Sequence, residues 1–311
     1  MALVPLTAVT RTQGNNAALK DGAVTPDGFT LAFQEVPVLV QAFRRMVRTL
    51  EFDVCEMAFT TYLCAKAHGK PFTALPVFLV RGLHHGAIRR GAEVRTPTAL
   101  HGRRVGVSRG YTVTTGVWAR GILADEYGVD LDQVTWVRSG DEHVAEYRPP
   151  GNVADVPAGS DLETMLADGD LAAAIGVESD AFPTLIPDAE EAAFDALRRR
   201  GLYPINHLVV VKDALLAEHP GLAPALFEAF AEAKRRYVDR LRRDAIGAPT
   251  RIDRMHRRVM DITGADPLPY GIAPNRPMID ELIRHAVRQR IIERPPAMAE
   301  LFPESTHQLI A

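Results

Sequence analysis

The chain has 311 residues, of which 47% are hydrophobic and 24% charged, and its formal net charge is −3. This composition is typical of a globular protein, and the weakly acidic balance provides no overall basic field for binding nucleic acid. The length exceeds the roughly 250–300 residues that one hydrophobic core supports, so we expect two lobes.

The N-terminus, MALVPLTAVTRTQGNN, has neither a basic region nor a long apolar region. No apolar run reaches the ~18 residues of a membrane span. We therefore expect no signal peptide, no membrane segment and a cytoplasmic location.

The first part of the chain alternates strand-like and helix-like segments. Apolar, β-forming stretches predict strands at Leu3–Val9, at the end of Gly22–Phe33, at Phe52–Met57 and at Leu75–Val80. Apolar residues at helical spacing predict helices over Val38–Leu50 and Phe59–His68. Such alternation favours a parallel, doubly wound sheet.

A second unit repeats this alternation after residue 93. Strands are predicted at Arg104–Val107, Val134–Val137 and Leu171–Gly176, and helices over Val113–Tyr127, Asp161–Gly169 and Ala189–Arg199. Asp141–Gly159 is rich in Pro, Gly and Asp without an apolar period, which is typical of an irregular loop.

The last third returns to a strand and then becomes helical. Tyr203–Val211 is strand-like, and helical spacing follows over Lys212–Glu218, Leu222–Arg242 and Pro277–Arg290. The simplest topology is a first lobe of residues 1–93 and 204–311 with residues 94–203 inserted as a second lobe. Two crossings between lobes form a hinge, and the cleft between them is the expected ligand site.

Cationic residues follow the apolar segment Leu75–Val80 directly. Arg81 can hold a carboxylate through a bidentate guanidinium, and His84 and His85 can exchange protons near neutral pH. In open α/β sheets, ligands bind at the carboxyl ends of strands. The alternative is that these are polar groups of a solvated turn.

Two further segments place polar groups at strand ends. Glu56 lies near the end of the Phe52–Met57 strand, where it could orient a histidine or simply face water, and Thr60 and Thr61 follow it. Thr114 and Thr115 lie at a predicted helix start, where backbone N–H groups and hydroxyls can hold an anion. The alternative is that these threonines only cap the helix.

The order and spacing of several segments resemble the 4,5-dihydroxyphthalate decarboxylase family. They are FDVCEMAFTTYL, LPVF-x-x-R-x-x-x-H, GRRVGV with VWARGIL-x-DEYGV and VTWVR, LADGDL-x-AAI, P-I-x-HLVV and YGIAPNR, which together span about Leu3 to Arg276. This family is similar in fold to type II periplasmic binding proteins and to thiamine-precursor and menaquinone-pathway enzymes. The resemblance therefore implies an α/β fold of two lobes with a ligand cleft between them.

The resemblance implies a carboxy-lyase that acts on a hydroxylated aromatic dicarboxylate. It makes His85 the first candidate for the proton donor and Arg81 the carboxylate anchor. It also places His207 where the chain recrosses toward the cleft, although a histidine in an apolar strand is more often a core residue. Arg276 is a weaker cationic candidate, with a surface position as its alternative.

The chain departs from the family where substrate should lie. The family has an Arg-His-Ser run where this chain has His84, His85 and Gly86, and the loop Ser108–Tyr111 also differs. We count His84 and Tyr111 among the candidate substrate contacts, and these differences leave the identity of the aromatic acid open.

No cofactor or metal is expected. No glycine-rich nucleotide loop follows a strand, and the adjacent His84 and His85 would point apart on a strand, which disfavours chelation by both. The expected partner is a small aromatic carboxylate, with a homo-oligomer possible. Two other functions remain open: a solute-binding protein for an organic anion, and a different lyase or dehydratase on the same fold.

Overall fold

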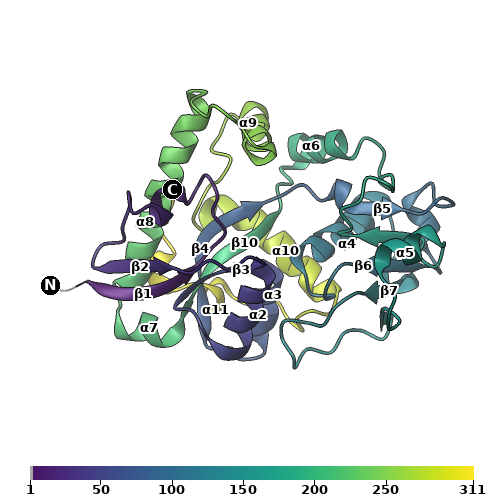
Figure 1. Cartoon of the computed structure of the whole chain (residues 1–311), viewed down its shortest axis with the longest axis horizontal. Helices are drawn as coiled ribbons and strands as arrows, with labels where there is room; N and C mark the ends of the chain where they lie inside the picture. The colour runs from purple at the N-terminus through teal and green to yellow at the C-terminus, as the bar shows by residue number, and fades with distance from the viewer. Residues whose placement is uncertain (1–2) are drawn as a thin grey trace.

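The computed structural model describes residues 3–311 and contains two five-stranded sheets (Figure 1). The first sheet has the order β2-β1-β3-β10-β4, with strands β1 Val4–Val9, β2 Phe29–Phe33, β3 Val54–Ala58, β4 Phe72–Arg81 and β10 Ile205–Lys212. The second has the order β5-β9-β6-β7-β8, with strands β5 Ile88–Arg90, β6 Arg104–Val107, β7 Thr135–Arg138, β8 Val153–Asp155 and β9 Ala173–Ile175.

Eleven α-helices within residues 3–311 surround these sheets. They are α1 Ala17–Lys20, α2 Leu39–Thr49, α3 Phe59–Ala67, α4 Thr114–Tyr127, α5 Leu162–Ala167, α6 Ala189–Arg200, α7 Asp213–Glu218, α8 Leu222–Arg242, α9 Arg251–Thr263, α10 Arg276–Arg288 and α11 Met298–Leu301. The two-lobed α/β architecture is as expected. Among the described residues, none of the helices combines the length and hydropathy that a membrane crossing needs.

Each sheet is mixed rather than wholly parallel, which corrects the expectation of parallel sheets. β1, β2 and β3 run parallel, but β10 is antiparallel to both β3 and β4. In the second sheet β5 is antiparallel to β9, while β6 is parallel to β7 and β9. The exceptions, β5 and β10, are the strands that follow the two crossings, because each enters its sheet from the other lobe.

The hinge consists of the segments that join β4 to β5 and β9 to β10. β5 pairs in the second sheet, so that sheet already begins at Ile88, ahead of residue 93. The predicted lobe boundaries at residues 93 and 203 stay a prediction. In Figure 1, β4 and β10 run from the first sheet toward the second, with α6 and α9 on one side and α2 and α3 on the other.

The apolar pattern explains why these elements pack. β3 is buried along its whole length, as a strand covered on both faces requires. α2 buries Leu39, Ala42, Phe43, Met46 and Val47 on one face. The arginines of α2 lie on its other face, so they are free to reach the second lobe.

Helices α4 and α10 pack closely between the lobes. The Gln289 side chain, just after α10, donates to the Val117 carbonyl at 2.9 Å and accepts from Arg120 Nε at 2.7 Å. A Cβ atom at Gly121 would lie 2.5 Å from the ring of His285. The helices approach this closely because residue 121 has no side chain.

We therefore expect Gly121→Ala to destabilise the protein by ~1–3 kcal/mol, the usual cost of overpacking a core. In an unhindered helix the same change would stabilise it, because Ala has the higher helix propensity. Urea unfolding measures the effect. Gly221→Ala is the control, since residue 221 has αR backbone angles and open space around its Cβ position. The same free energy of unfolding for Gly121→Ala and Gly221→Ala would contradict the close packing at residue 121.

Candidate functional site

A buried carboxylate and a histidine form a pair at the carboxyl end of the first sheet. Glu56 on β3 has an exposed fraction of 0%, and its Oε1 lies 2.6 Å from Nδ1 of His207 on β10. The side chain of His207 retains 19% exposure. Because Nδ1 is engaged with Glu56, Nε2 is the ring nitrogen available to a ligand. The structure thus brings together two of the three predicted catalytic residues.

Three strands meet at this pair. The second carboxylate oxygen of Glu56 accepts the backbone N–H of Arg11, just beyond β1, at 2.9 Å. Phe43 of α2 packs edge-on against the His207 ring with a centroid distance of 5.2 Å. The Glu56 carboxylate is therefore held by Arg11 and His207, and the His207 ring by Glu56 and Phe43, which fixes the orientation of the imidazole.

The N-termini of α3 and α4 meet across the two lobes. Thr60 donates its backbone N–H to Thr114 Oγ1 at 3.1 Å and its hydroxyl to the Thr112 carbonyl at 2.6 Å. The N-cap residues Ala58 and Val113 provide no side-chain cap. Thr114 thus caps the Thr60 N–H, while the other N–H groups of the two first turns and both helix dipoles make this region attractive to an anion. We call it the seam, defined by Glu56, His207 and Thr60 of the first lobe with Thr114 and His143 of the second.

Part of the predicted anion site is filled by the chain itself. The Glu142 carboxylate accepts the backbone N–H groups of Tyr111 at 2.7 Å and Thr112 at 3.1 Å, and the Thr112 hydroxyl at 2.7 Å. Arg138 also donates to Glu142, at 3.0 Å. The N–H and hydroxyl donors of the loop before α4 are therefore already paired with Glu142. An external anion could bind only the N–H groups at the N-terminus of α4.

The loop after β7 contributes a histidine that the sequence analysis missed. His143 Nδ1 lies 3.5 Å from Thr61 Oγ1, and its ring faces Phe43. Burial, together with the positive charges of Arg44 and Arg109, lowers the pKa of His143 to about 4. It lies within Asp141–Gly159, just after the predicted strand Val134–Val137, so the strand-end rule applied to that strand would have found it.

Helix α2 joins the lobes at the same place. Arg48 donates to Asp141 at 3.0 Å and to the Glu142 carbonyl at 2.9 Å, and Arg44 donates to Asp141 at 2.5 Å. These contacts hold the loop after β7 against α2, and with it His143.

Two arginines near the seam have no carboxylate within 4.0 Å among residues 3–311: Arg11 and Arg109. Desolvation lowers the pKa of Arg109, and the neighbouring positive charge of Arg11 adds to the lowering while Glu178 opposes it. Arg109 has φ of 68°, a left-handed conformation that non-glycine residues rarely adopt. Such backbone strain clusters at functional sites, so both arginines are candidate ligand contacts.

The structure places Arg81 away from the Glu56–His207 pair. It is the last residue of β4, and its guanidinium donates to the Tyr203 carbonyl at 2.8 Å and to Asn275 Oδ1. Desolvation lowers its pKa to about 10, so it stays charged at neutral pH. Its contacts belong to the second crossing and to the turn before α10.

The adjacent histidines have separate partners. His84 is buried, with Nε2 2.8 Å from Asn206 Oδ1, and burial lowers its pKa to about 4. His85 lies 2.9 Å from Glu126 near the C-terminal end of α4. Glu126 is twelve residues along the helix from Thr114, so these two residues lie about 18 Å apart along the axis of α4. His85 therefore pairs with Glu126, whereas Glu56 pairs with His207.

The remaining predicted contacts differ in their exposure. Tyr111 is buried, with the Arg120 guanidinium 3.9 Å from its ring centroid, so its ring is engaged inside the second lobe. Thr115 is half-buried beside Thr114 at the start of α4. Arg276 is exposed and forms an ion pair with Asp280 at 2.8 Å, the surface position considered as its alternative.

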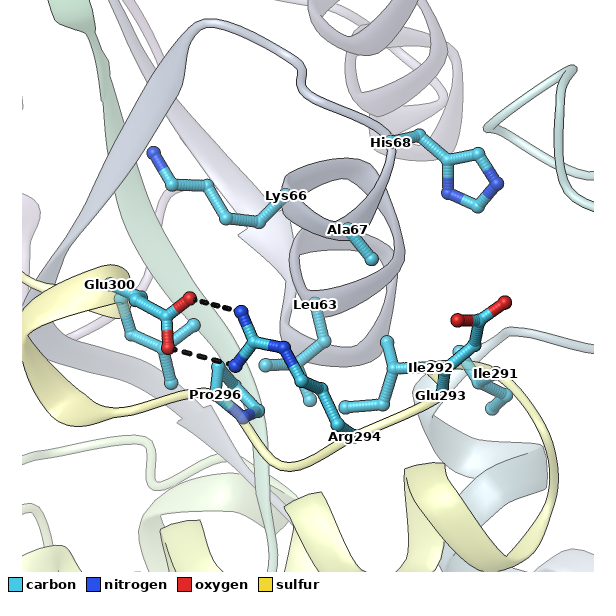
Figure 2. Close-up of a pocket in the computed structure, with 11 residues that line it drawn as sticks. Leu63, Lys66, Ala67, His68, Ile291, Ile292, Glu293, Arg294, Pro296 and Glu300 are labelled. Carbon is cyan, nitrogen blue, oxygen red and sulfur yellow. Dashed lines mark hydrogen bonds and ion pairs between the residues drawn. The ribbon is translucent and has the colours of Figure 1, made fainter.

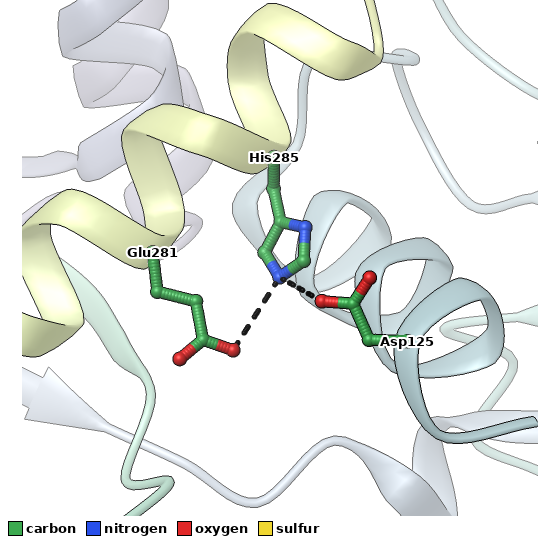
Figure 3. A group of neighbouring side chains, drawn as sticks. All are labelled: Asp125, Glu281 and His285. Atoms are coloured by element: carbon green, nitrogen blue, oxygen red, sulfur yellow. Dashed lines mark ion pairs between the residues drawn. The ribbon is translucent and has the colours of Figure 1, made fainter.

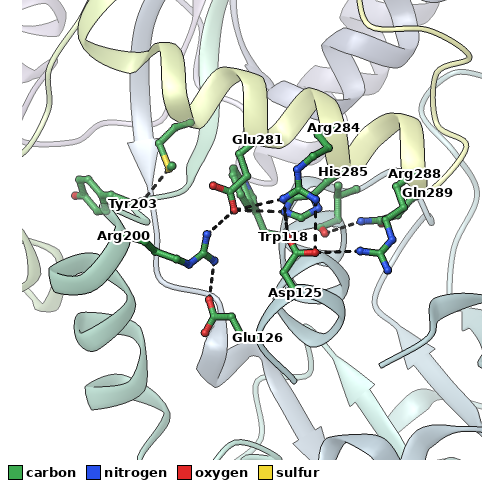
Figure 4. Close-up of polar contacts among 12 residues, drawn as sticks. Trp118, Asp125, Glu126, Arg200, Tyr203, Glu281, Arg284, His285, Arg288 and Gln289 are labelled. Carbon is green, nitrogen blue, oxygen red and sulfur yellow. Dashed lines mark hydrogen bonds and ion pairs between the residues drawn. The ribbon is translucent and has the colours of Figure 1, made fainter. Parts of the chain in front are cut away.

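Asp125, Glu281 and His285 have ligand atoms within 4.8 Å of one another, a spacing that could hold a cation (Figure 3). Arginines already neutralise the carboxylates: Arg284 lies 2.5 Å and Arg288 3.0 Å from Asp125, and Arg200 lies 2.8 Å from Glu281 (Figure 4). The surrounding positive charge disfavours a metal ion. The group is better described as an ion network that joins α4, α6 and α10.

A pocket of about 360 Å³ lies between α3 and the segment of residues 291–301 (Figure 2). Two of its cations already have partners: Arg294 binds Glu300 at 2.7 and 3.1 Å, and Lys66 donates to Thr73 at 2.9 Å and lies 3.7 Å from Asp213. The pocket presents no oriented acid–base pair, so the seam is the better candidate for chemistry.

Comparison with known proteins identifies the family. The chain is 31% identical over 304 residues to a 4,5-dihydroxyphthalate decarboxylase of Comamonas testosteroni, covering 91% of this chain and 92% of that protein. The chain belongs to the 4,5-dihydroxyphthalate decarboxylase family. A second member, from Pseudomonas putida, is 33% identical over 168 residues, which are 51% of this chain and 64% of that protein. No family model matches the chain.

Solved structures confirm the fold. The desulfurization enzyme DszB superposes with a TM-score of 0.57 at 14% identity, covering 96% of each chain. The periplasmic aliphatic sulphonate binding protein SsuA of Escherichia coli gives 0.55 at 10% identity, covering 97% of this chain and 92% of SsuA. At these identities the likeness establishes the two-lobed, periplasmic-binding-protein-like architecture alone.

The buried histidines make stability depend on pH. The pKa of His84 is about 4 in the folded chain against an ordinary value of 6.5, so below about pH 6.5 the unfolded chain binds a proton that the folded chain does not. We expect the free energy of unfolding to fall between pH 6.5 and 4, with His84 contributing on the order of 1 kcal/mol per pH unit.

Urea unfolding of wild type and His84→Gln at pH 7 and pH 5 measures this contribution. The variant should lose less stability between the two pH values than wild type does. An identical loss in both proteins would show that His84 is not kept neutral in the folded state.

Proposed function

We propose that this chain is a carboxy-lyase that releases CO2 from a hydroxylated aromatic dicarboxylate of the 4,5-dihydroxyphthalate type. Membership of the decarboxylase family supports the reaction. The observation that carries the proposed site is the Glu56–His207 pair, with Glu56 fully buried and 2.6 Å from a partly exposed His207. A protein that only captures a solute does not require such an oriented proton donor.

The reaction requires a proton on the ring carbon that carries the carboxylate. Loss of CO2 before protonation would leave an aryl carbanion, which is too unstable to form. A hydroxyl para to the carboxylate donates electron density, so the ring carbon can accept a proton first. The electrons of the C–C bond then return to the ring as CO2 departs.

In our proposal His207 is the proton donor. Nδ1 is bound to Glu56, and in this step the proton on Nε2 moves to the ring carbon. His207 becomes neutral and regains a proton from water, so the net change is one carboxylate and one proton converted into CO2 and one C–H bond. His85, the other candidate donor, has Glu126 as its partner instead.

The groups around the seam suit an anionic ligand. Arg11 donates its backbone N–H to Glu56. Arg109 is close enough to Arg11 for the charge of Arg11 to lower the pKa of Arg109. We propose that these arginines and the N-termini of α3 and α4 hold the two carboxylates. The hydroxyls of Thr61 and Thr115, together with neutral His143, are available to the ring hydroxyls.

The test is CO2 release from 4,5-dihydroxyphthalate by the purified protein. A general acid contributes typically 10²–10⁴-fold, so His207→Gln should lower kcat by about that factor while substrate still binds. His219→Gln is the matched control, because His219 packs on Phe29 at the start of β2, at the opposite end of the sheet. Absence of CO2 release by the wild type from a panel of hydroxyphthalates would refute the activity.

The same assay decides between the two histidines. If His85→Gln loses activity as His207→Gln is expected to, while His207→Gln retains wild-type kcat, the donor is His85 and the proposed site is wrong. Full activity in both variants would place the donor elsewhere.

A second test concerns the carboxylates. Arg109→Ala and Arg11→Ala should each raise KM by ~10-fold or more, the effect of losing one charge-assisted hydrogen bond of ~1.5–3 kcal/mol. Arg243→Ala, which removes an exposed arginine from the end of α8, should leave KM unchanged. Unchanged KM in both seam variants would remove these arginines from the binding site.

A further inference from the structure

A second pocket, of about 520 Å³, lies between the first hinge crossing, α6 and α9. We call it the hinge pocket. Its lining includes Arg81, Gly82 and Leu83 of the crossing, Phe194 of α6, and Arg254 and Met255 of α9. Neither Glu56, His207, Thr60 nor Thr114 lines it. In Figure 1, α6 and α9 lie together on the side of β4 and β10 away from α2 and α3.

The hinge pocket contains a buried cation without a counterion. Arg81 is 4% exposed, its Nε has no hydrogen-bond partner, and its other contacts are to the neutral Tyr203 carbonyl and Asn275 amide. No carboxylate within residues 3–311 lies within 4.0 Å of it. Burying a charge without a partner is costly, so a missing anion is the simplest completion of this site.

Arg120 is the comparison for Arg81, because it is also buried without a carboxylate partner. Both guanidinium groups face aromatic rings: Tyr111 and Trp136 lie 3.9 and 5.4 Å from Arg120, and Tyr203 lies 4.9 Å from Arg81. Arg120 lines none of the larger pockets of residues 3–311. Arg81 differs because it borders a space large enough for a small molecule.

The other lining groups indicate the chemistry of the ligand. Arg251, Arg254 and Arg258 of α9 also line the pocket, together with one carboxylate, that of Glu190. Glu190 lies 3.7 Å from Arg258, which also forms an ion pair with Glu191 outside the lining. Arg251 and Arg254 are exposed and have no ion pair within residues 3–311. Leu83, Phe194 and Met255 form an apolar cluster suited to a ring.

We infer that the hinge pocket is a second binding site, for a small aromatic carboxylate, separate from the site proposed for decarboxylation. The carboxylate would accept from Arg81 Nε and from the exposed guanidinium groups of Arg251 and Arg254, while the ring would pack on the apolar cluster. Since the pocket is built from the first crossing, α6 and α9, its ligand would contact elements of both lobes.

Calorimetric titration with phthalate tests the inference, since phthalate lacks the ring hydroxyl that the proposed reaction needs. We expect two molecules per wild-type chain. Arg254→Glu should weaken one of them about tenfold or more and leave the other unchanged. The control is Arg240→Glu, an equal charge reversal at an exposed position of α8, which should retain both binding events. Titration with 3,4-dihydroxybenzoate in parallel distinguishes a product-like monocarboxylate from a substrate-like dicarboxylate as the preferred ligand.

A single molecule of phthalate per wild-type chain, or two molecules that bind Arg254→Glu as they bind wild type, would overturn the second site. Either result leaves the proposed reaction untouched, because that is judged by CO2 release. Conversely, if the protein binds phthalate in the hinge pocket but releases no CO2, the second site stands and the proposed function is refuted.

Discussion

The buried carboxylate of Glu56 is the constraint on which the candidate site depends. An ionised carboxylate with no exposed surface is strongly unfavourable unless its oxygens are paired. Here one oxygen is held by His207 and the other by the backbone N–H of Arg11, so β3, β10 and the end of β1 must meet in one arrangement. The same contacts orient the imidazole, because Nδ1 is fixed and Nε2 is left for a ligand.

The two lobes meet through different kinds of contact on different sides of the hinge. At the seam, Thr60 and Thr114 join two helix N-termini, and arginines of α2 hold the loop after β7. Between α4 and α10 the contact is a close helix packing over Gly121, surrounded by an ion network. The seam contacts are a few hydrogen bonds and ion pairs, whereas the α4–α10 contact is core packing. The seam is therefore the side where the lobes can separate at lower free-energy cost.

Much of the fold follows from local pattern, and the candidate site follows only in part. Buried strands such as β3 and amphipathic helices such as α2 have clear apolar periods, so their positions could be predicted. Glu56 was selected because it lies near the end of a predicted strand, and His207 because the family resemblance places it where the chain recrosses toward the cleft. Their partnership could not be predicted, since it depends on β10 returning antiparallel beside β3 from 151 residues away.

Arg81, His84 and His85 are neighbours in sequence but have separate partners in the structure. β4 extends through Arg81, and a short 3-10 turn, His85–Ala87, follows. These residues therefore point to three different environments: Asn275, Asn206 and Glu126. Arg109 and His143 follow the ends of β6 and β7, so the strand-end rule could have selected both residues. Their proximity to the first lobe could not be predicted, because it depends on how the two lobes meet.

The most direct test of this account is a crystal structure of the inactive His207→Gln variant with 4,5-dihydroxyphthalate. We predict that a substrate molecule lies in the seam, with its carboxylates near Arg11 and Arg109 and its reacting carbon facing residue 207. Substrate bound with its carboxylate-bearing carbon against His85, and none in the seam, would contradict the assignment of the Glu56–His207 pair as the proton donor.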